Sequence, residues 1–247
     1  PYFLFAFKAC SYPDAFMHGK CPSSIPTHFL YSFPNSLSMD LTIILPTYNE
    51  RKNIEVLVPQ LIDLLSKRTK YSFEILVADD NSPDKTADAV RKFAKVHKNV
   101  RLLLRKKKEG LGLALIDAYN HAKGDRILSM DSDLAFPLED VLKLLNKLDE
   151  GYDLVVGSRH QQGEGAYEKK HLKTYFKSFI SVAGNKFTRL LLDLPVHDFS
   201  LNFRVIRKEM WKKLTLKERR NVMLLEMIVR VRQQGGRITD VPVTFKD

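Results

Sequence analysis

The chain has 247 residues, of which 40 are Lys or Arg and 29 are Asp or Glu, which gives a formal net charge of +11. Hydrophobic residues at 44% support a sizeable core, while two cysteines and 11 glycines exclude a disulfide-dense or collagen-like chain. No apolar run approaches the roughly 18 residues that a membrane-spanning helix needs, and the charge favours polyanionic partners such as nucleic acid, anionic lipid or a phosphate-bearing substrate.

Residues 1–38 differ from the rest of the chain. They are rich in Phe, Tyr, Pro and Ser and contain both cysteines, Cys10 and Cys21. The apolar run 3–7 fits the remnant of a signal or anchor core. The composition favours a poorly structured, non-native leader, or sequence translated upstream of a start at Met39. We therefore expect the folded domain to cover residues 40–247.

From residue 41 onward, short β-branched runs alternate with segments of helical periodicity. Strands are predicted over residues 41–45, 73–78, 100–104, 126–130, 153–157 and 238–245. Helices are predicted over residues 53–67, 82–97, 110–122, 138–148, 173–192 and 221–234. This alternation with short connections predicts an α/β fold with a mainly parallel central sheet flanked by helices.

Acidic residues follow three of the predicted strands. Glu50 follows the first, Asp79 and Asp80 the second, and Asp131 and Asp133 the fourth. Each has an ordinary explanation as a helix cap or a loop residue. Together, in a chain of net positive charge, they indicate a binding site, because ligands of open α/β sheets bind outside the carboxyl ends of the strands.

The pair Asp131 and Asp133 is the sharpest of these signals. Two carboxylates two residues apart after a hydrophobic strand can both face a hard cation. Mg²⁺ and Mn²⁺ prefer oxygen ligands and usually keep substrate phosphates in their coordination shell. The sequence thus predicts a metal-assisted phosphate site.

Five motifs, in one order, resemble those of the dolichyl-phosphate mannosyltransferases, which are inverting enzymes of the type-A glycosyltransferase (GT-A) fold. The motifs are LPTYNE at 45–50, ADDNSPDKT at 78–86, GLGLA at 110–114, MDSDLAFP at 130–137 and VVGSR at 155–159. The resemblance extends over residues 40–247. It implies a catalytic domain that transfers mannose from GDP-mannose to dolichyl or polyprenyl phosphate.

The resemblance also implies a role for each matching residue. The residues implied in nucleotide-sugar binding are Pro46, Tyr48, Glu50, Asp79, Asp80, Asp131 and Asp133. The residues implied at the acceptor phosphate are Arg159, Lys177, Ser181 and Arg204. Asp131 and Asp133 match the Mg²⁺ or Mn²⁺ site, and with Arg159 they form the implied catalytic set. Residues 198–204 match a segment near the sugar, and Glu226 matches an acidic residue on the following helix.

The lipid acceptor implies a peripheral position at the cytoplasmic face of a membrane. It further implies a membrane-anchoring subunit as a partner and no nucleic acid. Within the predicted helix 173–192, lysines and apolar residues at 173–180 fit a helix at the membrane interface. They fit a core-facing amphipathic helix equally well, so the sequence leaves both interpretations open.

The chain departs from the family pattern in several places. Ala135 stands where the family often has Gln, Lys177 replaces Arg, and Leu201-Asn202 replaces Ser-Gly. The chain ends at Asp247, where the family continues, so a C-terminal truncation is expected. Two alternatives stay open: a polyprenyl-phosphate hexosyltransferase that uses a UDP-sugar, and a non-catalytic nucleic-acid-binding protein, which the charge alone suggests.

Overall fold

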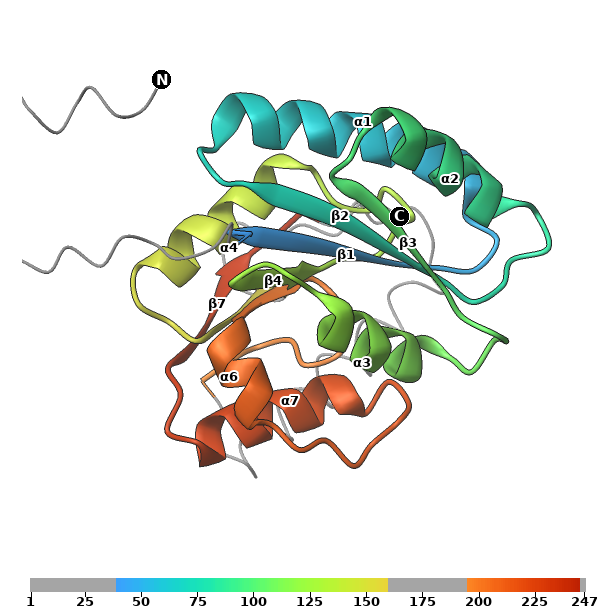
Figure 1. Cartoon of the computed structure of the whole chain (residues 1–247). Helices are drawn as coiled ribbons and strands as arrows, with labels where there is room; N and C mark the ends of the chain where they lie inside the picture. Colours follow the sequence, from blue (N-terminus) through green and yellow to red (C-terminus); the bar gives the residue numbers. More distant parts are fainter. Residues whose placement is uncertain (1–38, 160–194, 245–247) are drawn as a thin grey trace, which may run out of the picture. The chain divides into compact units, whose positions relative to one another are not determined.

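The computed structural model describes residues 39–159 and 195–244 (Figure 1). Its strands are β1 (Leu41–Thr47), β2 (Phe73–Asp79), β3 (Val100–Leu104), β4 (Arg126–Ser129), β5 (Leu154–Ser158), β6 (Arg204–Arg207) and β7 (Ile238–Pro242). Its helices are α1 (Arg51–Arg68), α2 (Thr86–Val96), α3 (Leu111–His121), α4 (Glu139–Asp149), α6 (Lys208–Lys213) and α7 (Met223–Gln233). The predicted leader 1–38 and the predicted helix 173–192 lie outside the described residues. Within those residues, no helix combines the length and apolarity needed to cross a membrane.

The described strands form one seven-stranded sheet in the order β3-β2-β1-β4-β6-β5-β7. Six of them run in the same direction, and β6 runs against both of its neighbours. The predicted α/β fold with a mainly parallel sheet is confirmed. Because β6 is reversed, its first residue Arg204 pairs with Ser129, the last residue of β4. The segment before β6 therefore reaches the edge at which the parallel strands end.

Helices cover both faces of the sheet. Helices α1 and α2 lie on one face, and α3, α6 and α7 lie on the other (Figure 1). Successive residues of β1 point to opposite faces of the sheet. Leu41, Ile43 and Leu45 pack in the core with α1 and α4. Ile44 packs in the core on the other face, with α3 and α7. A strand covered on both faces needs apolar residues at successive positions, which explains the LTIIL run.

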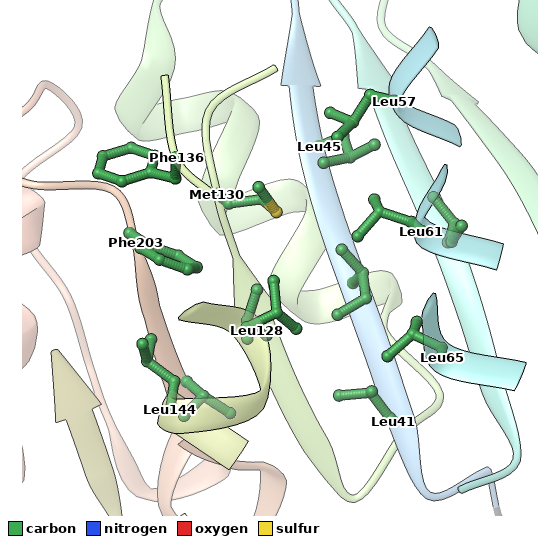
Figure 2. Packing of buried hydrophobic residues seen from close by; sticks show 14 of the residues in the cluster. Leu41, Leu45, Leu57, Leu61, Leu65, Leu128, Met130, Phe136, Leu144 and Phe203 are labelled. Atoms are coloured by element: carbon green, nitrogen blue, oxygen red, sulfur yellow. The ribbon is translucent and has the colours of Figure 1, made fainter. Parts of the chain in front are cut away.

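Helix α1 packs on β1 through a single row of leucines. Leu57, Leu61 and Leu65 are four residues apart, so they lie on one face of the helix. Figure 2 shows them directed toward Leu41 and Leu45 of β1, and all five side chains are fully buried. This packing fixes the position of the β1 carboxyl end, from which the LPTYNE motif continues.

Two phenylalanine rings connect the loop after β4 with the loop before β6. The rings of Phe136 and Phe203 lie 4.8 Å apart between centroids, and both belong to the α1-side core (Figure 2). Phe136 follows Asp133 by three residues, and Phe203 immediately precedes β6. The ring contact therefore ties the loop after β4 to the loop before β6.

The sequence patterns did not predict β6 and α6. Strand β6 has four residues and begins with an arginine, and the six-residue helix α6 contains three lysines, so neither shows an extended apolar pattern. Trp211 of α6 is nevertheless only 8% exposed and stacks on Tyr119 of α3, with 4.5 Å between ring centroids. Both elements therefore form because of their contacts with the rest of the fold rather than because of a local sequence pattern.

Gly124, between α3 and β4, is expected to tolerate no side chain. An added Cβ would lie 2.4 Å from backbone atoms of Leu41 and Thr42 in the central strand β1. The backbone N–H of Gly124 also donates to Thr42 Oγ1 at 2.8 Å. Gly124→Ala should lower the free energy of unfolding by about 3 kcal/mol, because β1 must shift.

Urea denaturation would measure this loss. The matched control is Lys123→Ala, since the neighbouring lysine side chain is exposed and its removal should change stability by less than about 0.5 kcal/mol. Equal unfolding midpoints for the two variants would contradict the close backbone approach.

Candidate active site

The predicted site residues that the structure describes gather at one edge of the sheet. Those at or just after the carboxyl ends of parallel strands are Pro46, Tyr48 and Glu50 for β1, Asp79 and Asp80 for β2, Asp131 and Asp133 for β4, and Arg159 for β5. Lys177 and Ser181 lie outside the described residues. The parallel strand order thus brings together residues that are more than a hundred positions apart in the chain.

The first two motifs form one structural unit. Helix α1 has no side-chain cap of its own, and the residues after β2 supply it. Three backbone N–H groups at the start of α1 donate to side chains of the second motif: Asn49 to Ser82 Oγ at 2.9 Å, Glu50 to Thr86 Oγ1 at 3.2 Å, and Arg51 to Asp84 Oδ2 at 3.0 Å. These contacts satisfy amides that the helix itself leaves unpaired.

The side chain of Asp79 also connects the loops after β1 and β2. Its carboxylate is fully buried and accepts hydrogen bonds from Thr47 Oγ1 at 3.0 Å and from the backbone N–H of Ser82 at 2.9 Å. The side chain therefore ties the end of β1 to the turn after β2. Any contribution of Asp79 to nucleotide binding would pass through the shape of these two loops.

Asp80 is paired with Arg105, a buried cation at the end of β3. Arg105 also donates to Asp117 Oδ2 at 2.8 Å and to Glu109 Oε2 at 3.1 Å. Burial opposes the charge of Arg105, but its hydrogen bonds to Asp117 and Asp80, together with the negative charges of these two carboxylates, outweigh burial and raise the pKa of the guanidinium. This cluster fixes the loop between β3 and α3, and it places Lys108 Nζ 3.6 Å from the centroid of the Tyr48 ring.

Asp131 and Asp133 lie on the sharp turn after β4. Asp131 Oδ1 accepts a hydrogen bond from Asn202 Nδ2 at 3.0 Å, and Asp133 Oδ1 accepts one from the Ala135 N–H at 3.1 Å. Leu134, between them and Ala135, has a φ of 62°. This left-handed conformation is strained for a leucine, so the turn is held by its surroundings.

The donor set of this turn fits a hard divalent cation. Burial raises the pKa of Asp131; the Asn202 hydrogen bond opposes this rise, and the charge of Asp133 adds to it. A bound cation would relieve both the burial and the repulsion. In the described part of the chain, no cluster of three or more acidic, His or Cys side chains could hold a metal. Substrate phosphate oxygens and water are the ligands that Mg²⁺ usually adds to one or two carboxylates.

The raised pKa of Asp131 has a consequence for stability. A carboxyl whose pKa is higher in the folded protein lowers the free energy of unfolding as the pH rises from its ordinary value of 3.8 through the folded-state pKa. Asp131→Asn removes this effect. The variant should therefore unfold at a higher temperature than the parent protein at pH 7 in EDTA, and the gain should shrink toward pH 4.

Thermal unfolding at the two pH values tests this expectation. Asp88→Asn is the control, because Asp88 is exposed on α2 and its ion pair with Arg91 lies on the surface, and surface ion pairs contribute little to stability. An Asp131→Asn protein that melts below the parent at pH 7 would contradict the raised pKa of the Asp131 carboxyl.

Arg159 is held at the end of β5 by a buried carboxylate. Its Nε donates to Asp198 Oδ2 at 2.7 Å, and its Nη2 donates to Asp198 Oδ1 at 3.3 Å and to Ser200 Oγ at 3.1 Å. Asp198 is fully buried, whereas the Arg159 side chain is 15% exposed. The two-point contact fixes the plane of the guanidinium at the same edge as Asp131.

The structure corrects the assignment of Arg204 to the acceptor phosphate. The side chain is fully buried and donates to the backbone carbonyls of Phe199, Leu201 and Leu224. Burial lowers its pKa to about 10. Arg204 therefore secures the loop before β6 against α7 rather than meeting a ligand.

Two further residues have contacts that sequence reasoning did not foresee. Glu226, predicted only as an acidic match on the last helix, accepts hydrogen bonds from the backbone N–H groups of Lys217 and Glu218 and from Arg230. Asn202, noted only as a departure from the family pattern, contacts Asp131. The contact between Asn202 and Asp131 joins residues 71 positions apart, so no local motif signals it. The contacts of Glu226 instead tie α7 to the segment eight to nine residues before it.

The sequence matches Glycosyl transferase family 2 over residues 42–215, well over half of the chain. The chain belongs to this family. This family 2 chain is 30% identical over 209 residues to the dolichol-phosphate mannosyltransferase of Pyrococcus furiosus, covering 84% of its own length and 56% of the archaeal protein. It thus spans little more than half of that relative.

A second relative of this family 2 chain is the polyprenol monophosphomannose synthase of Mycolicibacterium smegmatis. The two are 29% identical over 212 residues, which cover 83% of this chain and 77% of the mycobacterial protein. The resemblance predicted from the five motifs is confirmed by these two relatives.

Solved structures share the fold at low sequence identity. Glucosyl-3-phosphoglycerate synthase from Mycobacterium tuberculosis, solved with Mn²⁺, UDP and glucosyl-3-phosphoglycerate, is 16% identical with a TM-score of 0.59, over 84% of this chain and 71% of that one. Mannosyl-3-phosphoglycerate synthase from Rubrobacter xylanophilus is 18% identical with a TM-score of 0.61, over 85% of this chain and 68% of that one. The predicted GT-A fold is confirmed.

Proposed function

We propose that the chain transfers mannose from GDP-mannose to dolichyl or another polyprenyl phosphate, with inversion at the anomeric carbon and release of GDP. The observation that carries this proposal is the carboxylate pair Asp131 and Asp133 at the same sheet edge as the anchored Arg159. The relatives named as dolichol-phosphate mannosyltransferase and polyprenol monophosphomannose synthase support the choice of sugar and lipid.

We assign nucleotide binding mainly to the end of β1 and the loop that follows it. We assign Pro46, Tyr48 and Glu50 to the base and ribose, with Asp79 and Asp80 shaping the loops around them. Asp131 and Asp133 would hold Mg²⁺ or Mn²⁺, which when bound offsets the charge that develops on the leaving diphosphate. The buried Asp79 and the Arg105 cluster keep these loops in place before the donor arrives.

The acceptor side needs positioning and charge balance rather than a base. A phosphate monoester has a second pKa of about 6, so it is mostly dianionic at neutral pH. Arg159, fixed by Asp198, is the described residue suited to bind it, and we assign Lys177 and Ser181 to the same phosphate. A phosphate oxygen then attacks the anomeric carbon, and the bonding pair of the broken C–O bond leaves on GDP.

A lipid acceptor requires contact with a membrane. We propose that the protein acts peripherally at the cytoplasmic face, with a membrane-anchoring subunit as partner and without nucleic acid. The protein should therefore sediment together with anionic vesicles at low salt. If the protein bound no vesicles of any composition, the proposed peripheral membrane association would be wrong, whereas the proposed nucleotide site would be unaffected.

Calorimetric titration tests the nucleotide site separately. GDP-mannose and UDP-glucose would each be titrated into the full chain with Mn²⁺ and with EDTA. Binding of GDP-mannose that requires Mn²⁺ would support the proposal, and a preference for UDP-glucose would move the donor to the alternative hexosyltransferase. Binding of neither nucleotide sugar by folded protein would overturn the donor site.

A further inference from the structure

A chain of buried hydrogen bonds leads from the protein interior to Asp131. Tyr119 Oη lies 2.9 Å from Ser129 Oγ, Ser129 Oγ lies 2.7 Å from Asn202 Oδ1, and Asn202 Nδ2 lies 3.0 Å from Asp131 Oδ1. Tyr119, Ser129 and Asn202 are each 2% exposed or less. The chain connects α3, β4 and the loop before β6 to the turn that carries the two carboxylates.

The direction of each hydrogen bond is fixed by what the atoms can donate. The amide oxygen of Asn202 only accepts, so the Ser129 hydroxyl donates its single hydrogen to it. Ser129 must then accept from the hydroxyl of Tyr119. The Asn202 amide is left with its nitrogen toward Asp131, since a flipped amide would place its oxygen against the carboxylate, which cannot donate to it.

The start of the chain is firmly anchored. The Tyr119 ring stacks on Trp211, and Trp211 Nε1 donates to Asn120 Oδ1 at 3.0 Å. Ser129 is the last residue of β4, a strand in the centre of the sheet. Since both groups are fixed by packing, the Asn202 amide has little freedom to rotate away from Asp131.

We propose that Asn202 is a positioning residue that fixes the orientation of the Asp131 carboxylate for a divalent cation, through the chain that begins at Tyr119 and Ser129. Holding Oδ1 determines how the rest of the carboxylate faces the turn with Asp133. Contacts of this kind to a ligating group typically change metal affinity about 10- to 100-fold. The inference rests on the proposed function, because that function makes Asp131 a metal ligand.

The test is the affinity of the full 247-residue chain for Mn²⁺, measured without nucleotide and with GDP from the electron paramagnetic resonance signal of free Mn²⁺. Asn202→Ala should bind Mn²⁺ about 10- to 100-fold more weakly than the parent. Tyr119→Phe keeps the stacked ring and removes only the first hydroxyl, so it should weaken binding less, by about threefold, and it keeps the proposal testable if Asn202→Ala does not fold.

Thr42→Val is the matched control. It removes two buried hydrogen bonds of similar length at the other end of the sheet, because Thr42 Oγ1 donates to Glu74 Oε1 at 2.8 Å and accepts from the Gly124 N–H at 2.8 Å. It should lower the melting temperature without changing Mn²⁺ affinity. Asn202→Ala and Tyr119→Phe proteins that bind Mn²⁺ as tightly as a Mn²⁺-binding parent would overturn the role of Asn202 and leave the proposed function intact. A folded parent that binds no Mn²⁺ either alone or with GDP would overturn the metal assignment itself.

Discussion

Asp133→Asn is expected to reduce the rate of sugar transfer by about 1,000-fold, which is the scale of losing one charge that acts on a developing anion. Asp133 is exposed, and its described hydrogen bond is to the Ala135 N–H, which an asparagine oxygen can still accept. The variant should therefore fold normally and lose only the negative charge offered to the cation. The transfer rate at saturating Mn²⁺, with the melting temperature as a check on folding, measures the effect.

The control for this variant is Asp88→Asn on α2, which removes an exposed carboxylate paired with Arg91 and should leave the rate unchanged. If Asp133→Asn kept more than a tenth of the parent rate, the carboxylate pair would have no role in catalysis. The Mn²⁺ dependence of the residual rate would then point to other ligands.

Arg159→Ala is expected to have two separate effects. Transfer should fall by about 100- to 1,000-fold because the acceptor phosphate loses its cation. The free energy of unfolding should fall by about 3 kcal/mol, because Asp198 is left charged and fully buried. The rate and the urea denaturation midpoint report the two effects independently.

A double variant separates the two effects. Adding Asp198→Asn to Arg159→Ala removes the buried negative charge that lost its cation, so most of the lost stability should return while transfer stays low. Recovery of transfer along with stability would mean that Arg159 acts only as the partner of Asp198. Arg159→Lys should keep a cation but lose the two-point contact, and its main defect should be a raised KM for the lipid acceptor.

Much of the fold could be predicted because the strands are covered on both faces. Runs such as LTIIL at 41–45 and FEILVA at 73–78 are apolar at all but one position each, which is typical of buried parallel strands. Their polar members, Thr42 and Glu74, are buried and hydrogen-bonded to each other. The parallel arrangement then requires residues after different strands to meet at one edge. That requirement alone brings Glu50, Asp80 and Asp131 to the same edge.

The rest depends on contacts that no local pattern records. Arg204 was predicted to bind the acceptor phosphate because it is a cation near the site. In the structure it begins the antiparallel strand β6, and its side chain is buried and donates hydrogen bonds to backbone carbonyls. Arg159 and Asp198 are 39 residues apart, and Asn202 and Asp131 are 71 apart. Such pairs follow from the position of β6 in the sheet, which four residues of sequence do not specify.

The most direct test of the proposed activity is the formation of a lipid-linked sugar. The full chain would be incubated with dolichyl phosphate in detergent micelles and with labelled GDP-mannose or labelled UDP-glucose, in Mn²⁺ or in EDTA. We predict labelled mannosyl lipid from GDP-mannose in Mn²⁺ only, with inverted configuration, and formed about 1,000-fold more slowly by Asp133→Asn. Folded, Mn²⁺-binding protein that yields no labelled lipid from either donor would contradict the proposed transfer.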